Sequence, residues 1–119
     1  MQIMVTLDLN SVRKSLDAML EAGRRLLKES QNVFGISTKD AVKILLDFQP
    51  EFFDKVLDTY RMRGGERAEA SVAEYYFMLA TAYGMVKREQ EGKAWFAKGS
   101  GIRTGGTFFE WAQPYYNKK

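Results

Sequence analysis

Residues 71–86 read SVAEYYFMLATAYGMV, and Glu74 is the only charged side chain among them. Apolar and aromatic side chains recur in steps of four and three, the spacing of one helix face, at Val72, Tyr76, Leu79, Tyr83 and Val86. The adjoining face is apolar too and consists of Tyr75, Met78, Ala82 and Met85. A helix that is apolar nearly all round is buried in a core or between subunits. We therefore expect a mainly α fold, a helical bundle around a central buried helix at about residues 66–91.

This central stretch is not expected to cross a membrane. A membrane-spanning helix needs about 20 consecutive apolar residues, whereas Lys87, Arg88 and Glu89 follow directly here. At the start of the chain, residues 1–9 hold no lysine or arginine and do not read as a secretory signal. We expect a cytoplasmic protein without a membrane partner.

Composition limits the classes of function. The chain has 119 residues, enough for a core without metal or disulfide, and we expect a single domain over residues 1–119. Its 45% hydrophobic and 28% charged residues are ordinary for a globular protein, and a net charge of +3 permits a polyanionic partner without demanding one. The lack of cysteine and histidine excludes disulfides, thiolate nucleophiles, imidazole bases and the common zinc sites. No cofactor or metal is therefore expected.

The N-terminal residues alternate between apolar and polar positions. Ile3, Val5, Leu7 and Leu9 share one side of a two-residue period, and Gln2, Met4, Thr6 and Asp8 share the other, which indicates a strand. An isolated strand needs a partner for its backbone groups, and a second copy of itself in a dimer would supply one. The alternative is an N-terminal extension of the first helix or a strap over the core.

Helical signals follow this strand. Asn10 or Ser11 can cap a first helix that runs to about Ser30, and Gly23 in its apolar stripe marks a place where a neighbouring backbone can cross. The segment Ile36–Asp40 opens a second helix with a hydroxyl cap. Pro50-Glu51 begins a third helix, and Gly64-Gly65 is a turn.

Residues 1–48 resemble a ribbon-helix-helix DNA-binding domain of the MetJ/Arc/CopG type. The resemblance rests on the alternating strand from Gln2 to Leu7, the helix that begins near Asn10-Ser11, and the turn Gly35-Ile36-Ser37-Thr38 before the segment AVKILLDF. It implies that two chains pair their strands into an antiparallel ribbon that enters the major groove, while the N-terminus of the second helix binds phosphate.

Individual DNA contacts follow from this resemblance. It implies that Gln2, Met4 and Thr6 face base edges and that Ser37, Thr38 and Lys39 meet the DNA backbone. Arg24 and Arg25 are the least neutralised cations of the first helix and join the DNA-binding candidates.

The segment from Lys93 to Lys119 is basic and aromatic and is an alternative site. Such interleaving can stack on unpaired bases along a phosphate backbone, and the same residues can instead form a packed flap or a subunit contact. The candidate nucleic-acid or partner residues are Lys93, Trp95, Lys98, Arg103, Trp111, Tyr115 and Tyr116. Together with the rest of residues 50–119 they form the expected helical core and C-terminal segment.

An enzyme is not expected. Asp54 with Asp58, or Glu66 with Glu69, could bind magnesium or act as acid and base, but each pair has a nearby lysine or arginine, so solvent-facing ion pairs are the expected explanation. The chain has no glycine-rich phosphate loop, nucleophile motif or dinucleotide fingerprint.

The first functional hypothesis is a small homo-oligomeric protein that binds duplex DNA through the ribbon, as a repressor or a plasmid or phage accessory factor. The alternative is a non-catalytic helical module for protein–protein interaction or assembly. That module would bind through the C-terminal segment or through the face of Tyr75, Met78, Ala82 and Met85.

Overall fold

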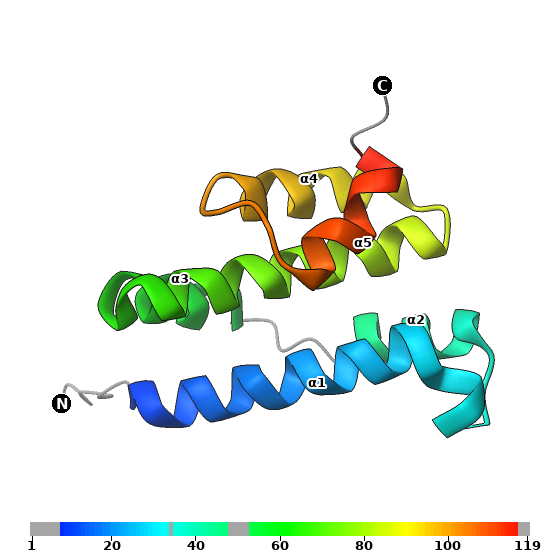
Figure 1. Cartoon of the computed structure of the whole chain (residues 1–119), viewed down its shortest axis with the longest axis horizontal. Helices are drawn as coiled ribbons and strands as arrows, with labels where there is room; N and C mark the ends of the chain where they lie inside the picture. Colours follow the sequence, from blue (N-terminus) through cyan, green and yellow to red (C-terminus); the bar gives the residue numbers. More distant parts are fainter. Residues whose placement is uncertain (1–7, 34, 48–52, 117–119) are drawn as a thin grey trace, which may run out of the picture.

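The protein is described by a computed structural model, which covers residues 8–33, 35–47 and 53–116. These residues form five helices: α1 (Leu9–Val33), α2 (Thr38–Asp47), α3 (Phe53–Met85), α4 (Glu89–Ser100) and α5 (Thr107–Tyr116). Helix α3 lies in the middle, with α1 and α2 on one side and α4 and α5 on the other (Figure 1). The mainly α prediction is confirmed.

The central part of α3 is buried, as its sequence predicts. Every residue from Tyr75 to Ala82 is buried, and Phe77, Met78, Ala80 and Ala82 have no exposed surface. The helix ends at Met85 rather than near Glu91, because the backbone leaves the helical conformation at Lys87 and a new helix begins at Glu89.

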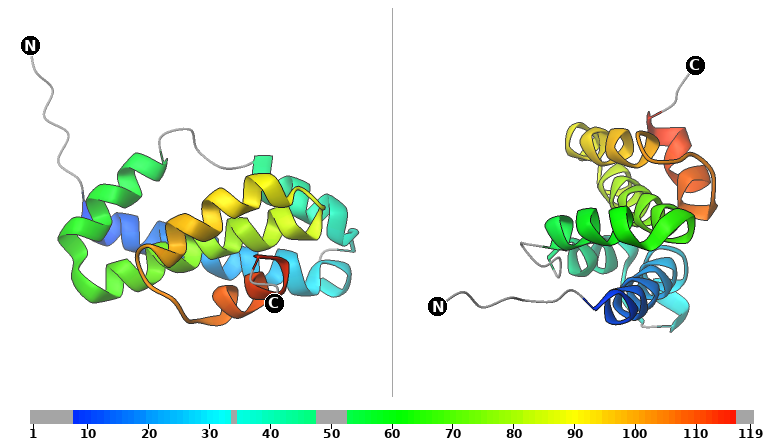
Figure 2. Two further views of the ribbon diagram at one scale, coloured as in Figure 1. Left: turned by 90° about the horizontal axis from the view of Figure 1, so that it is seen from above. Right: turned by 90° about the vertical axis from the view of Figure 1, so that its left-hand side faces the viewer.

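A sharp bend at Gly65 divides α3 into a first arm (residues 53–64) and a second arm (residues 66–85). Gly65 has φ 76° and ψ −163°, a conformation open to glycine, so the turn predicted there is confirmed. Figure 2 shows the two arms meeting at one end of the molecule. The predicted start of this helix at Pro50-Glu51 lies outside the described residues.

A polar cluster holds the two arms together. The Tyr76 hydroxyl donates a hydrogen bond of 2.6 Å to Asp54 Oδ1, and Lys98 of α4 forms an ion pair with the same carboxylate. Partial burial would raise the pKa of Asp54, but the hydrogen bonds from Lys98 and Tyr76 hold it below its usual value. The rings of Phe53 and Tyr75 add an edge-to-face contact at 5.4 Å. Both arms and α4 are therefore joined at one point.

The ribbon-helix-helix assignment is wrong. The described residues contain no strand, and Leu9, predicted as the end of the strand, is the first residue of the 25-residue helix α1. The rest of the predicted strand, residues 2–7, lies outside the described part of the chain. The apolar faces of α1 and α2 pack on α3 of the same chain, so they are not available to pack beneath a β-ribbon as the ribbon-helix-helix fold requires.

The start of α1 explains part of this error. The cap is Asp8 rather than Asn10 or Ser11, because the Asp8 carboxylate accepts hydrogen bonds from the Asn10 and Ser11 amides at 3.0 and 3.3 Å. A carboxylate that fits an alternating pattern can equally cap a helix. The hydroxyl cap predicted for α2 is confirmed, since Ser37 Oγ accepts the Asp40 amide at 3.1 Å.

Glycines set the closest approaches between α3 and its neighbours. A Cβ at Gly23 of α1 would lie 2.1 Å from Sδ of Met78, so the group that packs closely at this glycine is a side chain of α3 rather than the neighbouring backbone expected there. An ideal Cβ at Gly84 would lie 2.6 Å from Cγ of Tyr115, and one at Gly99 would lie 2.8 Å from Cε1 of Phe77. The helices that cover α3 therefore pack at distances that only glycine allows.

Glu74 connects α3 to the beginning of α5. One carboxylate oxygen accepts the Phe108 amide at 3.4 Å, while the other is buried against Gly106 without a hydrogen-bond partner among the described residues. Desolvation raises the pKa of Glu74 above its usual value, because it outweighs the amide hydrogen bonds from Phe108 and Phe109. Nearby Glu110 raises it further.

Among the described residues, no helix combines the length and the apolar character that crossing a membrane requires.

We predict that Gly99→Ala destabilises the protein by about 1–2 kcal/mol, because the fully buried Phe77 ring would have to move. Urea unfolding measures the change. Gly101→Ala is the matched control, because Gly101 has φ −69° and its nearest neighbour would lie 3.4 Å away. That variant should be neutral or more stable by up to about 1 kcal/mol. Equal losses for both variants would contradict the packing argument.

Glu74→Gln should change how stability depends on pH. The folded-state pKa of Glu74 is raised, so its contribution is fully present below the unfolded value near 4.5 and is lost as pH rises through the folded value. The permanently neutral glutamine avoids this loss and still accepts the Phe108 amide. Unfolding from pH 4 to 7 should therefore show the variant gaining stability relative to the original chain as pH rises. A constant difference would refute the burial of charge at Glu74.

Candidate interaction groove

The DNA-binding residues expected from the sequence are not brought together within the described structure. Gln2, Met4 and Thr6 lie outside the described residues. Ser37 is used as the cap of α2, and Thr38 is the first residue of that helix. Lys39 is exposed one residue further on.

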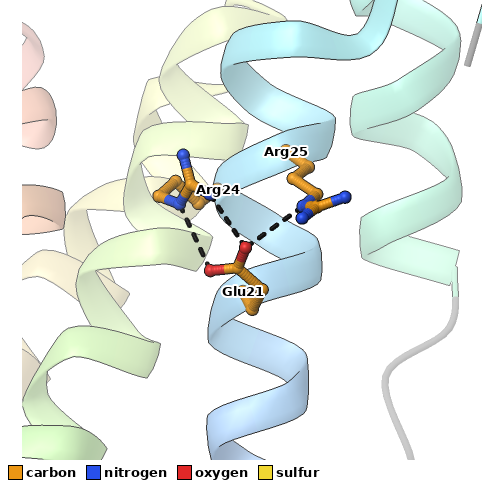
Figure 3. Close-up of polar contacts among 3 residues, drawn as sticks. All are labelled: Glu21, Arg24 and Arg25. Atoms are coloured by element: carbon orange, nitrogen blue, oxygen red, sulfur yellow. Dashed lines mark hydrogen bonds and ion pairs between the residues drawn. The ribbon is translucent and has the colours of Figure 1, made fainter. Parts of the chain in front are cut away.

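Arg24 and Arg25 are paired within α1, contrary to the expectation that they are the least neutralised cations. Arg24 Nη2 and Arg25 Nε lie 2.8 and 3.1 Å from the same oxygen, Glu21 Oε1 (Figure 3). All three side chains are at least partly exposed. Their hydrogen bonds lower the pKa of Glu21, with the bond from Arg24 as the largest cause. These arginines form a local surface network.

The aromatic rings of the C-terminal segment pack within the protein. Trp95 stacks on Tyr76 with ring centroids 5.7 Å apart, and Phe96 stacks on Phe109 at 5.9 Å. The Tyr116 hydroxyl donates to the Ala80 carbonyl at 2.5 Å. These rings cover α3, so their faces meet other rings of the chain.

The remaining residues of that alternative site are spread over the surface. Lys93 is exposed on α4, and Arg103 is exposed in the loop that follows this helix. Lys98 is held by Asp54. Trp111 and Tyr115 of α5 are half-buried and face α1 and the end of α3 across a shared hollow. Lys118 and Lys119 lie outside the described residues.

The alternative partner surface on α3, the apolar face of Tyr75, Met78, Ala82 and Met85, is covered by other helices of the chain. Tyr75, Met78 and Ala82 are buried, and α1 crosses Met78 at Gly23. Only Met85, at the last turn of α3, is half-buried. A partner can therefore reach this face only at the C-terminal end of the helix.

A groove lies at that end, between α2 and the turn from α3 to α4. It consists of two adjoining hollows of about 420 and 320 Å³ that share Lys39, Val42 and Val86. We call it the basic groove, and its lining includes Lys39, Asp40, Val42, Lys43, Leu46, Asp47, Met85, Val86, Lys87 and Arg88. The apolar members form the floor, because Val42 is fully buried and Leu46, Met85 and Val86 are half-buried.

Cations outnumber acids around the basic groove. Lys39, Lys43 and Lys87 are exposed, and none forms an ion pair with another described residue. Arg88 differs, because its guanidinium makes two hydrogen bonds to Glu91 at 2.8 and 2.5 Å. Three ammonium groups without an ion pair among the described residues therefore lie beside the apolar floor.

Lys87 occupies a conformation that lysine rarely adopts. Its φ is 61°, the left-handed region in which glycine usually ends a helix. Its amide donates to the Gly84 carbonyl at 3.1 Å and the Arg88 amide donates to Tyr83 at 2.8 Å, which is the Schellman pattern of a helix end. A side chain in this region costs roughly 1 kcal/mol or more. The chain thus carries an ammonium group at the groove where glycine would be more stable.

The sequence contains only part of the signal for this groove. Lys39 and Lys43, four residues apart, share one face of α2 with Val42 and Leu46. The other wall comes from Met85 to Arg88, which is distant in the sequence and reaches α2 only through the fold. Among the described residues, no group of three acidic side chains is placed to hold a metal ion.

We predict that Lys87→Gly raises the free energy of unfolding by about 1 kcal/mol, because it relieves the strained backbone. Lys87→Ala is the matched control, since it removes the same ammonium group but keeps a Cβ in the left-handed region. It should leave stability within about 0.5 kcal/mol. Chemical denaturation compares the two. If alanine stabilised as much as glycine, charge repulsion rather than backbone strain would be the cause.

No family model, curated protein or solved structure matches this chain.

Proposed function

We propose that this protein is a non-catalytic interaction module that holds an acidic, amphipathic helix of a partner protein in the basic groove. The observation that carries the proposal is the combination of an apolar floor with three unpaired ammonium groups, those of Lys39, Lys43 and Lys87. An amphipathic helix in a groove buries its apolar face and leaves its polar flanks at the rim.

The floor suits such an occupant. Val42 and Leu46 come from α2, while Met85 and Val86 come from the end of α3. The hollow of about 420 Å³ has room for a few apolar side chains of one short helical segment. Methionine adapts its shape readily and is common at surfaces that bind helices. The apolar contact would supply affinity, and the lysines would select acidic flanks.

The acids in the same lining favour a protein partner over nucleic acid. Asp40 and Asp47 border the groove beside Lys39 and Lys43. A phosphate backbone would meet these carboxylates together with the lysines, whereas a helix with mixed side chains can place its acids opposite the lysines only. The net charge of +3 is also modest for a protein that binds polyanions.

A charge exchange tests this proposal. The probe is a synthetic helical peptide with leucine along one face and glutamate on the other, and ¹H–¹⁵N spectra map its contacts. It should shift resonances of α2 and of the end of α3. In the double variant Lys39→Glu/Lys43→Glu its affinity should fall at least about tenfold, because two attractive rim charges become repulsive. The same peptide with lysine in place of glutamate should then bind the variant better than the original chain.

The control is Lys14→Glu/Lys55→Glu, which has the same net charge but changes two exposed lysines outside the groove. It should leave acidic peptide binding within about twofold. Equal losses of peptide affinity in both double variants would overturn the groove as the site.

Two further outcomes would also overturn the proposal. One is self-association that depends on Lys39 and Lys43, measured by sedimentation. The other is salt-dependent binding of a labelled DNA duplex through the same residues.

A further inference from the structure

A further hollow lies between α1, α3 and α5. It shares Met85 with the basic groove but none of the groove's polar lining residues. It has a volume of about 300 Å³ and is lined by Leu27, Lys28, Thr81, Met85, Trp111 and Tyr115. We call it the Trp111 pocket. We propose that the Trp111 pocket binds a small planar apolar molecule that carries a carboxylate, such as an aromatic acid.

The apolar walls of the pocket are held in place by the core. Leu27 and Thr81 are buried. Trp111 packs edge-to-face on the buried Phe108, with ring centroids 5.2 Å apart. The ring of Tyr115 lies over Gly84, where a Cβ would approach its Cγ to 2.6 Å. A ligand would therefore find two aromatic walls already positioned, which lowers the entropic cost of binding.

The polar groups of the pocket favour an anionic ligand. Lys28 Nζ lies 5.7 Å from the centre of the Trp111 ring and forms no ion pair with another described residue. The Tyr115 hydroxyl likewise has no hydrogen-bond partner within the described residues. No acidic side chain is among the lining residues. A carboxylate could accept hydrogen bonds from the ammonium and the phenol.

Thr81 is not a hydrogen-bond donor for the ligand carboxylate. Its hydroxyl donates to the Phe77 carbonyl at 2.8 Å, so its one proton is used inside α3. Thr81 thus offers no proton to a ligand, and the side-chain donors among the other lining residues belong to Lys28, Trp111 and Tyr115. A lining that is mostly apolar and holds one ammonium group matches a flat apolar molecule that carries one negative charge.

The volume limits the ligand class. About 300 Å³ is at the lower end of the range for small-molecule sites, so one ring with a short acidic chain fits better than a nucleotide or a larger cofactor. The pocket shares Met85 with the basic groove but not Lys39, Lys43 or Lys87. The proposal therefore does not depend on the function proposed for the groove.

Trp111 itself can report binding. The chain has two tryptophans, and Trp95→Phe leaves Trp111 as the only one while keeping a ring against Tyr76. Its emission is titrated with 3-phenylpropionate and, in parallel, with the neutral amide of the same shape. We expect saturable binding of the acid and binding of the amide that is at least about tenfold weaker, because the amide cannot form charge-assisted bonds.

Variants locate this effect. Lys28→Met keeps the apolar stem of the side chain but removes the charge, and it should reduce the affinity for the acid to that for the amide. Lys14→Met, at an exposed position of the same helix outside the pocket, should change nothing. Lys39→Glu/Lys43→Glu should also leave acid binding intact, which separates this result from failure of the groove proposal. Absence of saturation, equal affinity for acid and amide, or no effect of Lys28→Met would overturn the proposal.

Discussion

Burial of the second arm of α3 is the constraint on which the rest of the structure depends. A helix that is apolar on nearly every face has to be covered from all sides. Helix α1 covers one side, α4 and α5 cover the opposite side, and the first arm folds back at Gly65 to cover a third. Glycines at the crossings bring these helices close enough to exclude water from large side chains such as Phe77.

This covering accounts for the character of the C-terminal segment. Its aromatic residues pack against Tyr76, Phe77 and one another, so the feature that suggests stacking on nucleic-acid bases is used to close the core. Its cations remain outside, but Lys98 turns back to Asp54 and ties α4 to both arms of α3. The same residue types can serve either purpose, and packing decides between them.

The sequence predicts the elements of this fold better than their assembly. The buried stretch from Tyr75 to Ala82, the turn at Gly65 and the Ser37 cap follow from local patterns and are confirmed. Asp8 shows the limit, because one carboxylate fits both an alternating strand and a helix cap. The proposed sites are harder still to predict, since the basic groove and the Trp111 pocket each join residues that are distant along the chain.

The basic groove and the Trp111 pocket both lie where the covering of α3 stops. At Met85 and Val86 the helix is still apolar, but the next residues are Lys87 and Arg88, and the Schellman turn redirects the chain into α4. Helix α2 approaches this end from one side and α5 from the other, and Met85 lies in the lining of both the basic groove and the Trp111 pocket. Apolar surface that neither helix covers is therefore left beside unpaired lysines. Glycine at position 87 would adopt this turn without strain, so the chain carries an exposed lysine at the end of α3 at a cost in stability.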